Sequence, residues 1–98
     1  MKNLFNIRTR REVEIHRRMR LSVAAYAYEF DRDHIMTDHE FDAESRLVDL
    51  SIDTGNVKMD AWFRENFDPS TGQWIHKHPE FLKVRGIYER FHAPPQSR

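Results

Sequence analysis

The chain of 98 residues contains no cysteine and only three glycines. Without cysteine there is no disulfide, no thiolate nucleophile and no cysteine-ligated zinc site. Three glycines are too few to build the glycine-rich loops that cradle phosphates. The longest apolar run, 23–27, falls far below the roughly 20 residues that a membrane-spanning helix needs, and the N-terminus lacks the apolar segment of a secretory signal. We therefore expect a cytoplasmic protein.

Formal charges balance to zero but are unevenly distributed along the chain. Residues 8–20 contain six arginines and two glutamates, whereas residues 29–53 contain nine acidic residues and two arginines. This predicts a basic end and an acidic middle. Proteins that bind duplex DNA usually have an overall basic excess, which this chain lacks. A protein partner with complementary charged patches fits the distribution at least as well.

The length predicts one small domain over 1–98, with a folded part at 8–92 and loose tails at 1–7 and 93–98. Apolar residues recur at spacings of three and four, which favours helices. We expect an all-α domain of about four helices with a central helical hairpin. The predicted helices span 10–30, 37–52, 57–67 and 79–91, with a brief extended piece at 73–76.

Two further details follow from the predicted helices. In the predicted helix 10–30, apolar residues form one buried face: Ile15, Met19, Val23, Tyr26 and Phe30. Arg11, Arg18 and Glu29 are expected to face water. The second predicted helix opens with Thr37-Asp-His-Glu40, a capping box. Its apolar face is expected to be Phe41, Leu47, Val48 and Leu50, and Val57, Trp62, Phe63 and Phe67 are expected to anchor the third helix.

The corner between the first two helices, residues 28–42, contains the most distinctive polar pattern. It places Asp31, Asp33, Asp38 and Asp42 beside the aromatic residues Tyr28 and Phe41. Such an edge of carboxylates and rings is suited to a polar ligand. A well-capped corner that serves folding alone explains the same residues.

The corner resembles the N-terminal Ia domain of bacterial NAD-dependent DNA ligases, over about residues 12–52. In those domains one helix ends in Tyr-His, and after a loop the next opens with Ser/Pro-Asp-x-x-Tyr-Asp. Here the matching residues are Tyr28-Glu29 and Thr37-Asp38-His-Glu-Phe41-Asp42. The C-terminal half, including residues 68–79, resembles small ligase-related proteins of phages and their bacterial hosts.

The resemblance implies a site for the nicotinamide mononucleotide half of NAD. Its residues are Tyr28, Asp38, Phe41 and Asp42, with Glu29 where the family has histidine. Asp38 and Asp42 are one helical turn apart, so both can face one ligand. Carboxylates suit ribose hydroxyls and a cationic ring, and an aromatic face suits a cation. The two departures are Glu29, which would repel a phosphate, and Phe41, which lacks the tyrosine hydroxyl.

Catalysis is not expected. Lys58-Met-Asp60-Ala61 is similar to the Lys-x-Asp-Gly nucleophile motif of ligases, but it lacks the glycine and the nucleotidyltransferase domain. We interpret Lys58 as a solvated helix residue. The sequence therefore predicts no catalytic residue and no enzyme.

A metal site is the next alternative, because His76 and His78 alternate as ligands on a strand can. Further ligands would have to come from elsewhere. The preferred interpretation is that Trp74 and Ile75 pack inward and His78 caps the last helix. No metal is predicted.

These observations predict a non-catalytic binding module with a protein-interaction or regulatory role and a protein partner. The resemblance of the C-terminal half adds the hypothesis of a phage protein that acts on host machinery. One alternative is a module that binds nicotinamide mononucleotide or NAD through Tyr28, Asp38 and Asp42. Another is a DNA-associated protein that uses Arg8, Arg10, Arg11, Arg17, Arg18 and Arg20.

Overall fold

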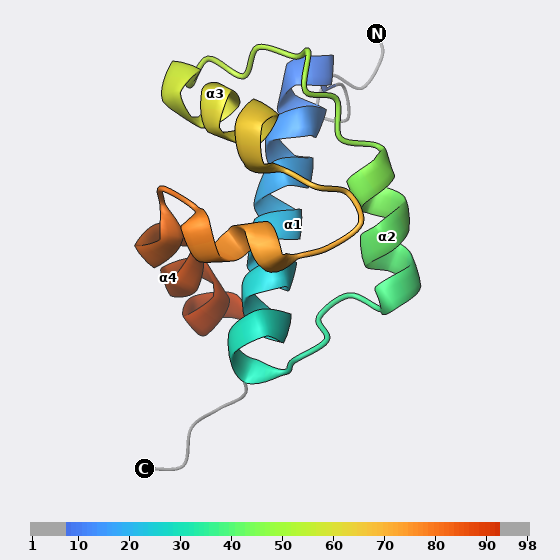
Figure 1. Cartoon of the computed structure of the whole chain (residues 1–98), viewed down its shortest axis with the longest axis vertical. Coiled ribbons are helices and arrows are strands. Elements are labelled where there is room, and N and C mark those ends of the chain that lie inside the picture. The colour runs from blue at the N-terminus through green and yellow to red at the C-terminus, as the bar shows by residue number, and fades with distance from the viewer. Residues whose placement is uncertain (1–7, 93–98) are drawn as a thin grey trace, which may run out of the picture.

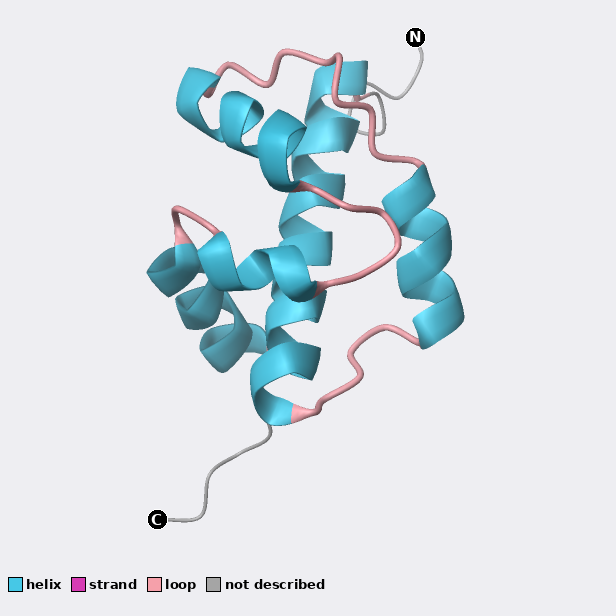
Figure 2. Cartoon of the chain, viewed as in Figure 1, coloured by secondary structure: helices cyan, strands magenta, loops and turns pink. Residues whose placement is uncertain are grey.

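The computed structural model describes residues 8–92, so the predicted tails at 1–7 and 93–98 lie outside the described part. Its elements are α1 (Arg10–Asp31), α2 (Asp38–Arg46), α3 (Val57–Asn66), a 3-10 turn η2 (Gln73–Lys77) and α4 (Phe81–Phe91) (Figure 1). Figure 2 shows helices and loops and, within residues 8–92, no strand. The prediction of an all-α domain of four helices is confirmed.

The longest helix, α1, lies at the centre of the domain (Figure 1). α2 runs back along one side of it, which forms the predicted helical hairpin, and η2 and α4 pack against α1 as well. The loop between α3 and η2 crosses α1 towards α2 and then returns (Figure 1). No helix within 8–92 has the length and apolar character needed to cross a membrane.

The core is built around the middle of α1, where every residue from 21 to 27 is buried. Alanines at 24, 25 and 27 let the neighbouring elements approach the helix closely. The predicted apolar stripe is correct at Val23 and Tyr26 and at the half-buried Met19, which packs against the core, but Ile15 and Phe30 are 43% and 41% exposed. Other elements cover the middle of α1 on several sides. All side chains of residues 21–27 are therefore buried, and not only those on a single face of the helix.

Helix α2 is shorter than predicted, since it ends at Arg46 and not near residue 52. The chain does not continue as a helix after Arg46, because side chains of α1 bind the backbone of Asp49. The N–H of Asp49 donates to Glu14 at 3.2 Å, and the carbonyl of Asp49 accepts from Arg18 at 2.8 Å. Leu47, Val48 and Leu50 therefore lie beyond the helix, and Leu47 is 57% exposed.

Three smaller predictions are corrected at η2, α3 and α4. The segment predicted as extended, 73–76, belongs to a 3-10 turn that buries Trp74 and Ile75, and the Trp74 indole N–H donates to the carbonyl of Thr71 at 2.7 Å. Val57 is 78% exposed because it begins α3 at the surface. α4 begins at 81 and not at 79.

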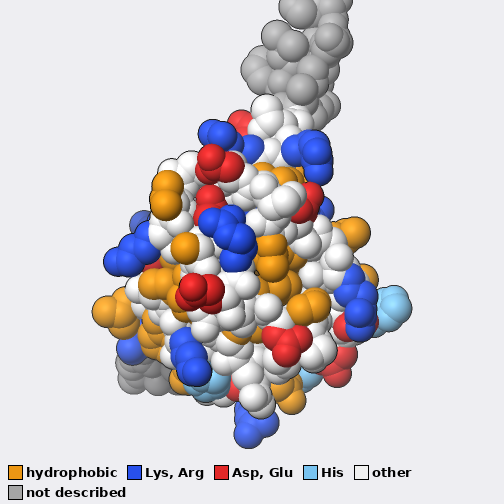
Figure 3. Space-filling view, turned by 45° about the horizontal axis from the view of Figure 1, so that its top comes forward, with side chains coloured by type: hydrophobic (Ala, Val, Ile, Leu, Met, Phe, Trp, Pro, Cys, Tyr) orange, Lys and Arg blue, Asp and Glu red, His pale blue; other side chains and the backbone are white. Residues whose placement is uncertain are grey.

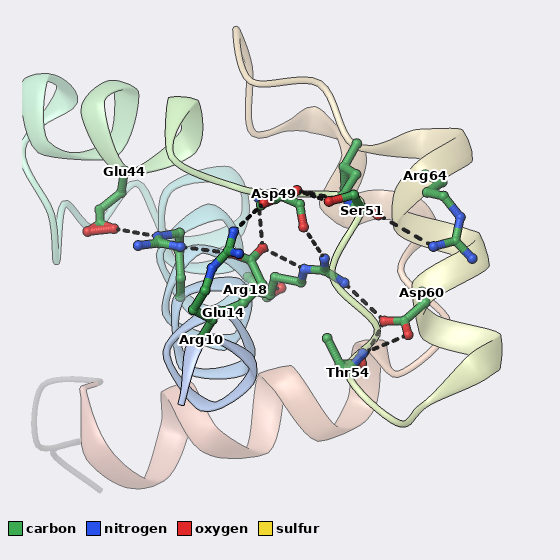
Figure 4. Close-up of polar contacts among 12 residues, drawn as sticks. Arg10, Glu14, Arg18, Glu44, Asp49, Ser51, Thr54, Asp60 and Arg64 are labelled. Atoms are coloured by element: carbon green, nitrogen blue, oxygen red, sulfur yellow. Dashed lines mark hydrogen bonds and ion pairs between the residues drawn. The ribbon is translucent and has the colours of Figure 1, made fainter. Parts of the chain in front are cut away.

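A buried network of ion pairs and hydrogen bonds joins α1 to α3 and to the loop after α2 (Figure 4). Arg18 donates to Glu14 at 2.8 Å and to Asp60 at 3.0 Å, and all three are at least 95% buried. The expectation that Arg18 faces water is therefore wrong. Its three partners lie on α1, in the loop after α2 and on α3, and only the fold brings them together.

The basic N-terminal segment is largely neutralised by acids from later in the chain. Arg10 contacts Asp49 at 3.2 Å, and Arg17 contacts Glu44 at 3.2 Å, with Arg20 at 3.6 Å from the same carboxylate. On the face that Figure 3 shows, basic and acidic side chains are interspersed. Contact with DNA through these arginines stays a prediction, and it would have to compete with these pairs.

Candidate functional site

A pocket of about 400 Å³ lies between the C-terminal half of α1, the start of α2 and the loop 69–73. Its volume is within the range of sites that hold small molecules. All five residues predicted for the candidate site line this pocket: Tyr28, Glu29, Asp38, Phe41 and Asp42. The structure therefore brings the predicted residues together. The chemical character of the lining residues determines which ligands suit the pocket.

The end of α1 shapes the first wall. Arg32 adopts the left-handed conformation with φ 55°, which stops the helix. Its N–H donates to the carbonyl of Tyr28 at 3.1 Å, and the N–H of Asp33 donates to that of Ala27 at 3.0 Å. This turn brings His34 back to Tyr28, with the two rings edge to face and 4.8 Å between their centroids. Tyr28, His34 and Asp33 all line the pocket.

The start of α2 shapes the second wall, and the capping box predicted there is confirmed. The N–H of Thr37 donates to Glu40 at 2.9 Å, and the N–H of Glu40 donates to the Thr37 hydroxyl at 3.0 Å. The bond from the Thr37 N–H, together with the Thr37 hydroxyl, lowers the pKa of Glu40. The cap fixes where the helix begins and so places Asp38, Phe41 and Asp42 towards α1.

The loop 69–73 supplies the third wall of the pocket. Asp68 organises it by accepting from the N–H and the hydroxyl of Ser70, at 2.9 and 2.7 Å, and these bonds lower the pKa of Asp68. Gly72 lies so near the hairpin that a Cβ there would be 3.3 Å from Ala25 Cβ and 3.4 Å from Phe41 Cζ. The residues Asp68-Pro-Ser-Thr-Gly72 are typical of a turn, but nothing in them indicates which helices the turn meets.

Four carboxylates line the pocket, and each contacts a hydrogen-bonding or basic neighbour. Glu29 accepts from Nε2 of His76 at 2.8 Å, in the tautomer that carries the proton on that nitrogen, and Asp42 contacts Arg46 at 3.2 Å. Asp38 lies 3.5 Å from His34, and Asp33 accepts from the Tyr88 hydroxyl at 2.8 Å. Burial of Tyr88 and then its bond to Asp33 raise the pKa of that phenol. Of these basic neighbours only His34 lines the pocket itself.

The carboxylates lie at different depths. The Asp38 side chain is 92% exposed and marks the rim, and that of Asp42 is 52% exposed. The Glu29 side chain is only 18% exposed and lies deeper. The expectation that Glu29 faces water is therefore wrong. Asp31, which belongs to the same acidic corner in sequence, does not line this pocket.

The other candidate residues occupy separate places. Asp60, two residues after Lys58 in the ligase-like motif, is buried and accepts hydrogen bonds from Arg18 and Thr54. Burial acts to raise its pKa, but bonds from Thr54 and the charge of Arg18 outweigh burial and lower it. His76 contacts Glu29, whereas His78 accepts from the N–H of Glu80 at 3.0 Å. The prediction that His78 caps the last helix is wrong, because Glu80 is the N-cap of α4 and no side chain caps that helix. Residues 8–92 contain no group of three or more histidines and carboxylates arranged to hold a metal.

The chain was compared with protein families, curated proteins and solved structures, and none of the three comparisons gave a match. The likeness to ligase Ia domains therefore stays a resemblance of short motifs. What bears on function is the pocket, with three aromatic or imidazole rings and four carboxylates around one small volume.

Proposed function

We propose that the chain is a non-catalytic binding module whose pocket holds the nicotinamide riboside unit that nicotinamide riboside, nicotinamide mononucleotide and NAD share. The observation behind the proposal is that Tyr28, Glu29, Asp38, Phe41 and Asp42, chosen from sequence, line a single pocket of suitable volume. The motif resemblance suggests the ligand class. The carboxylates and aromatic rings of the lining suit the hydroxyls and the cationic ring of that class.

A ligand of this class has a flat cationic ring and a ribose with two adjacent hydroxyls. The rings of Tyr28, His34 and Phe41 offer aromatic surface to the cation. Asp38 and Asp42 offer acceptors for the hydroxyls from one side of α2. Gly72 packs closely beside Phe41, where an added Cβ would come within 3.4 Å of Cζ, so a larger residue there would press on this ring.

Calorimetric titration and thermal melting with nicotinamide riboside and nicotinamide mononucleotide test this function. A ligand present at about 100 times its Kd stabilises the fold by about 2.7 kcal/mol. Asp38→Ala should weaken binding about fivefold or more without loss of stability, because its side chain is at the rim. Glu65→Ala, at an exposed position on α3, is the control and should bind like the parent chain. If neither compound binds, the proposed function is wrong.

A protein-interaction role is a second candidate, favoured by a groove of about 170 Å³ between α1, α3 and the start of α4. Ile15, Met19 and Met59 line it, with Lys83 also in the lining. Methionine side chains adapt readily to an inserted apolar group, so the groove suits one apolar anchor of a protein partner.

Affinity capture from bacterial lysate with paired variants tests this second candidate. Ile15→Glu should abolish capture of a specific partner, because it places a charge in the groove. Val13→Glu is the control, since Val13 is on the same helix with similar exposure (38% against 43%) but outside the groove. A partner captured equally by both variants would not use the groove, and absence of any partner would count against the role.

A further inference from the structure

The charge around the pocket near α1 and α2 is one-sided. Its lining contains Glu29, Asp33, Asp38 and Asp42, and neither lysine nor arginine. The last turn of α1, beside the pocket, contains no basic residue, and Arg32, which follows it as the C-cap, does not line the pocket. The cavity and its rings define the site, and this charge restricts which ligands suit it.

The basic side chains in and beside the pocket are already engaged. His34, which is part of the lining, lies 3.5 Å from Asp38. Arg46 holds Asp42 through two contacts, at 3.2 and 3.3 Å, and His76 is bound to Glu29 at 2.8 Å. A phosphate entering the pocket would have to draw one of these groups away from a carboxylate. That carboxylate would then repel the phosphate.

Three backbone N–H groups of the third wall, those of Ser70, Thr71 and Gln73, are also used. The N–H of Ser70 donates to Asp68 at 2.9 Å, and that of Gln73 donates to the Thr71 hydroxyl at 3.1 Å. The N–H of Thr71 donates to the carbonyl of Asp68 at 3.3 Å. At the start of α2 the capping box places the Glu40 carboxylate at the positive end of the helix. These N–H groups and the start of α2 therefore already have partners within the protein, which a phosphate would have to displace.

We infer that the pocket selects a phosphate-free cationic riboside over the corresponding 5′-phosphate. This inference rests on the proposed function and specifies its ligand class. The ring cation meets aromatic faces and carboxylates, and the ribose hydroxyls donate to Asp38 and Asp42. A phosphate would change the ligand charge by about two units at neutral pH and would meet acids in place of bases.

The test compares nicotinamide riboside with nicotinamide mononucleotide by calorimetry at low ionic strength. The riboside should bind roughly tenfold or more tightly, and the ratio should shrink in about 1 M salt, where exposed charges are screened within about 3 Å. Glu29→Gln, which preserves the side-chain shape, should improve binding of the mononucleotide and lower the ratio by about threefold or more.

Glu65→Gln is the matched control, because it removes the same charge from an exposed position on α3 that does not line the pocket. It should leave the ratio unchanged. The inference is overturned if the mononucleotide binds as tightly as the riboside or if Glu29→Gln and Glu65→Gln act alike, and in either case the binding function itself stands. Failure of both compounds to bind removes the function and the inference together.

Discussion

The guanidinium of Arg18 donates from Nη1 to the Asp60 carboxylate at 3.0 Å, although 42 residues separate the two in sequence. The same guanidinium donates from Nε to Glu14 and from Nη2 to the carbonyl of Asp49, both at 2.8 Å. It also lies over the Phe63 ring, 5.3 Å from the centroid. One side chain thus joins α1, the loop after α2 and α3 (Figure 4).

Arg18→Met should destabilise the domain strongly, by about 3–5 kcal/mol. Methionine fills much of the same space but leaves the buried carboxylates of Glu14 and Asp60 without their shared cation. Urea denaturation monitored by circular dichroism measures the loss. Arg85→Met is the comparison, because Arg85 is paired with Glu89 on the exposed side of α4 and exposed pairs contribute at most about 1 kcal/mol. Equal effects of the two changes would contradict a structural role for the network.

The network also shows what sequence could not predict. Glu14 and Arg18, four residues apart, have the spacing of an ordinary exposed helix pair. Their burial depends on Asp60, which no local pattern connects to them. The early end of α2 has the same origin, since Glu14 and Arg18 bind the backbone at Asp49.

The candidate pocket was more predictable because two of its walls are local. Residues 28–42 form one helix end, one short loop and one capped helix start, so spacing and the Thr37–Glu40 capping box were enough to orient Tyr28, Asp38 and Phe41. The third wall required the contact of Gly72 with Ala25 and Phe41, between segments far apart in sequence.

His78 should make the domain less stable in mild acid. Burial lowers the pKa of its imidazole to about 4, against the opposing effect of Glu80. The unfolded chain, with a pKa near 6.5, therefore takes up the proton first. Stability should fall as the pH drops from about 6.5 to about 4, by on the order of 3 kcal/mol, and this contribution should level off below that. Thermal melts across this range measure it.

The histidine variants separate this effect from other titrations. His78→Asn keeps an acceptor for the N–H of Glu80 but removes the titrating ring, so the slope between pH 6.5 and 4 should flatten even if overall stability falls. His16→Asn, at an exposed position on α1, should keep the slope of the parent chain. A slope unchanged by His78→Asn would assign the acid sensitivity to other groups.

Ser45→Ala should leave stability unchanged or raise it by up to about 1 kcal/mol. The Ser45 side chain is 1% exposed, and its hydroxyl has no hydrogen-bond partner within residues 8–92. Removing an unsatisfied buried hydroxyl removes its desolvation cost. Ser22→Ala provides the contrast, because that buried hydroxyl donates to the carbonyl of Arg18 at 2.7 Å. Urea midpoints in the reverse order would show that Ser45 is satisfied in solution.

Two glycine-to-alanine changes should have opposite signs. At Gly72 the new Cβ would lie 3.3 Å from the Cβ of Ala25, on a buried helix that cannot yield easily, so Gly72→Ala should destabilise by roughly 1 kcal/mol or more. At Gly86, inside α4, a Cβ meets nothing within 4 Å. Gly86→Ala should therefore stabilise by about 0.5–1 kcal/mol through helix propensity alone.

Urea denaturation measures both changes, and titration with nicotinamide riboside adds a second measurement. Gly72→Ala also narrows the pocket between Phe41 and Ala25, so it should weaken riboside binding, whereas Gly86→Ala should leave binding unchanged. If Gly72→Ala were stabilising, the loop 69–73 would have to lie farther from α1, and the third wall of the pocket would not be where the structure places it.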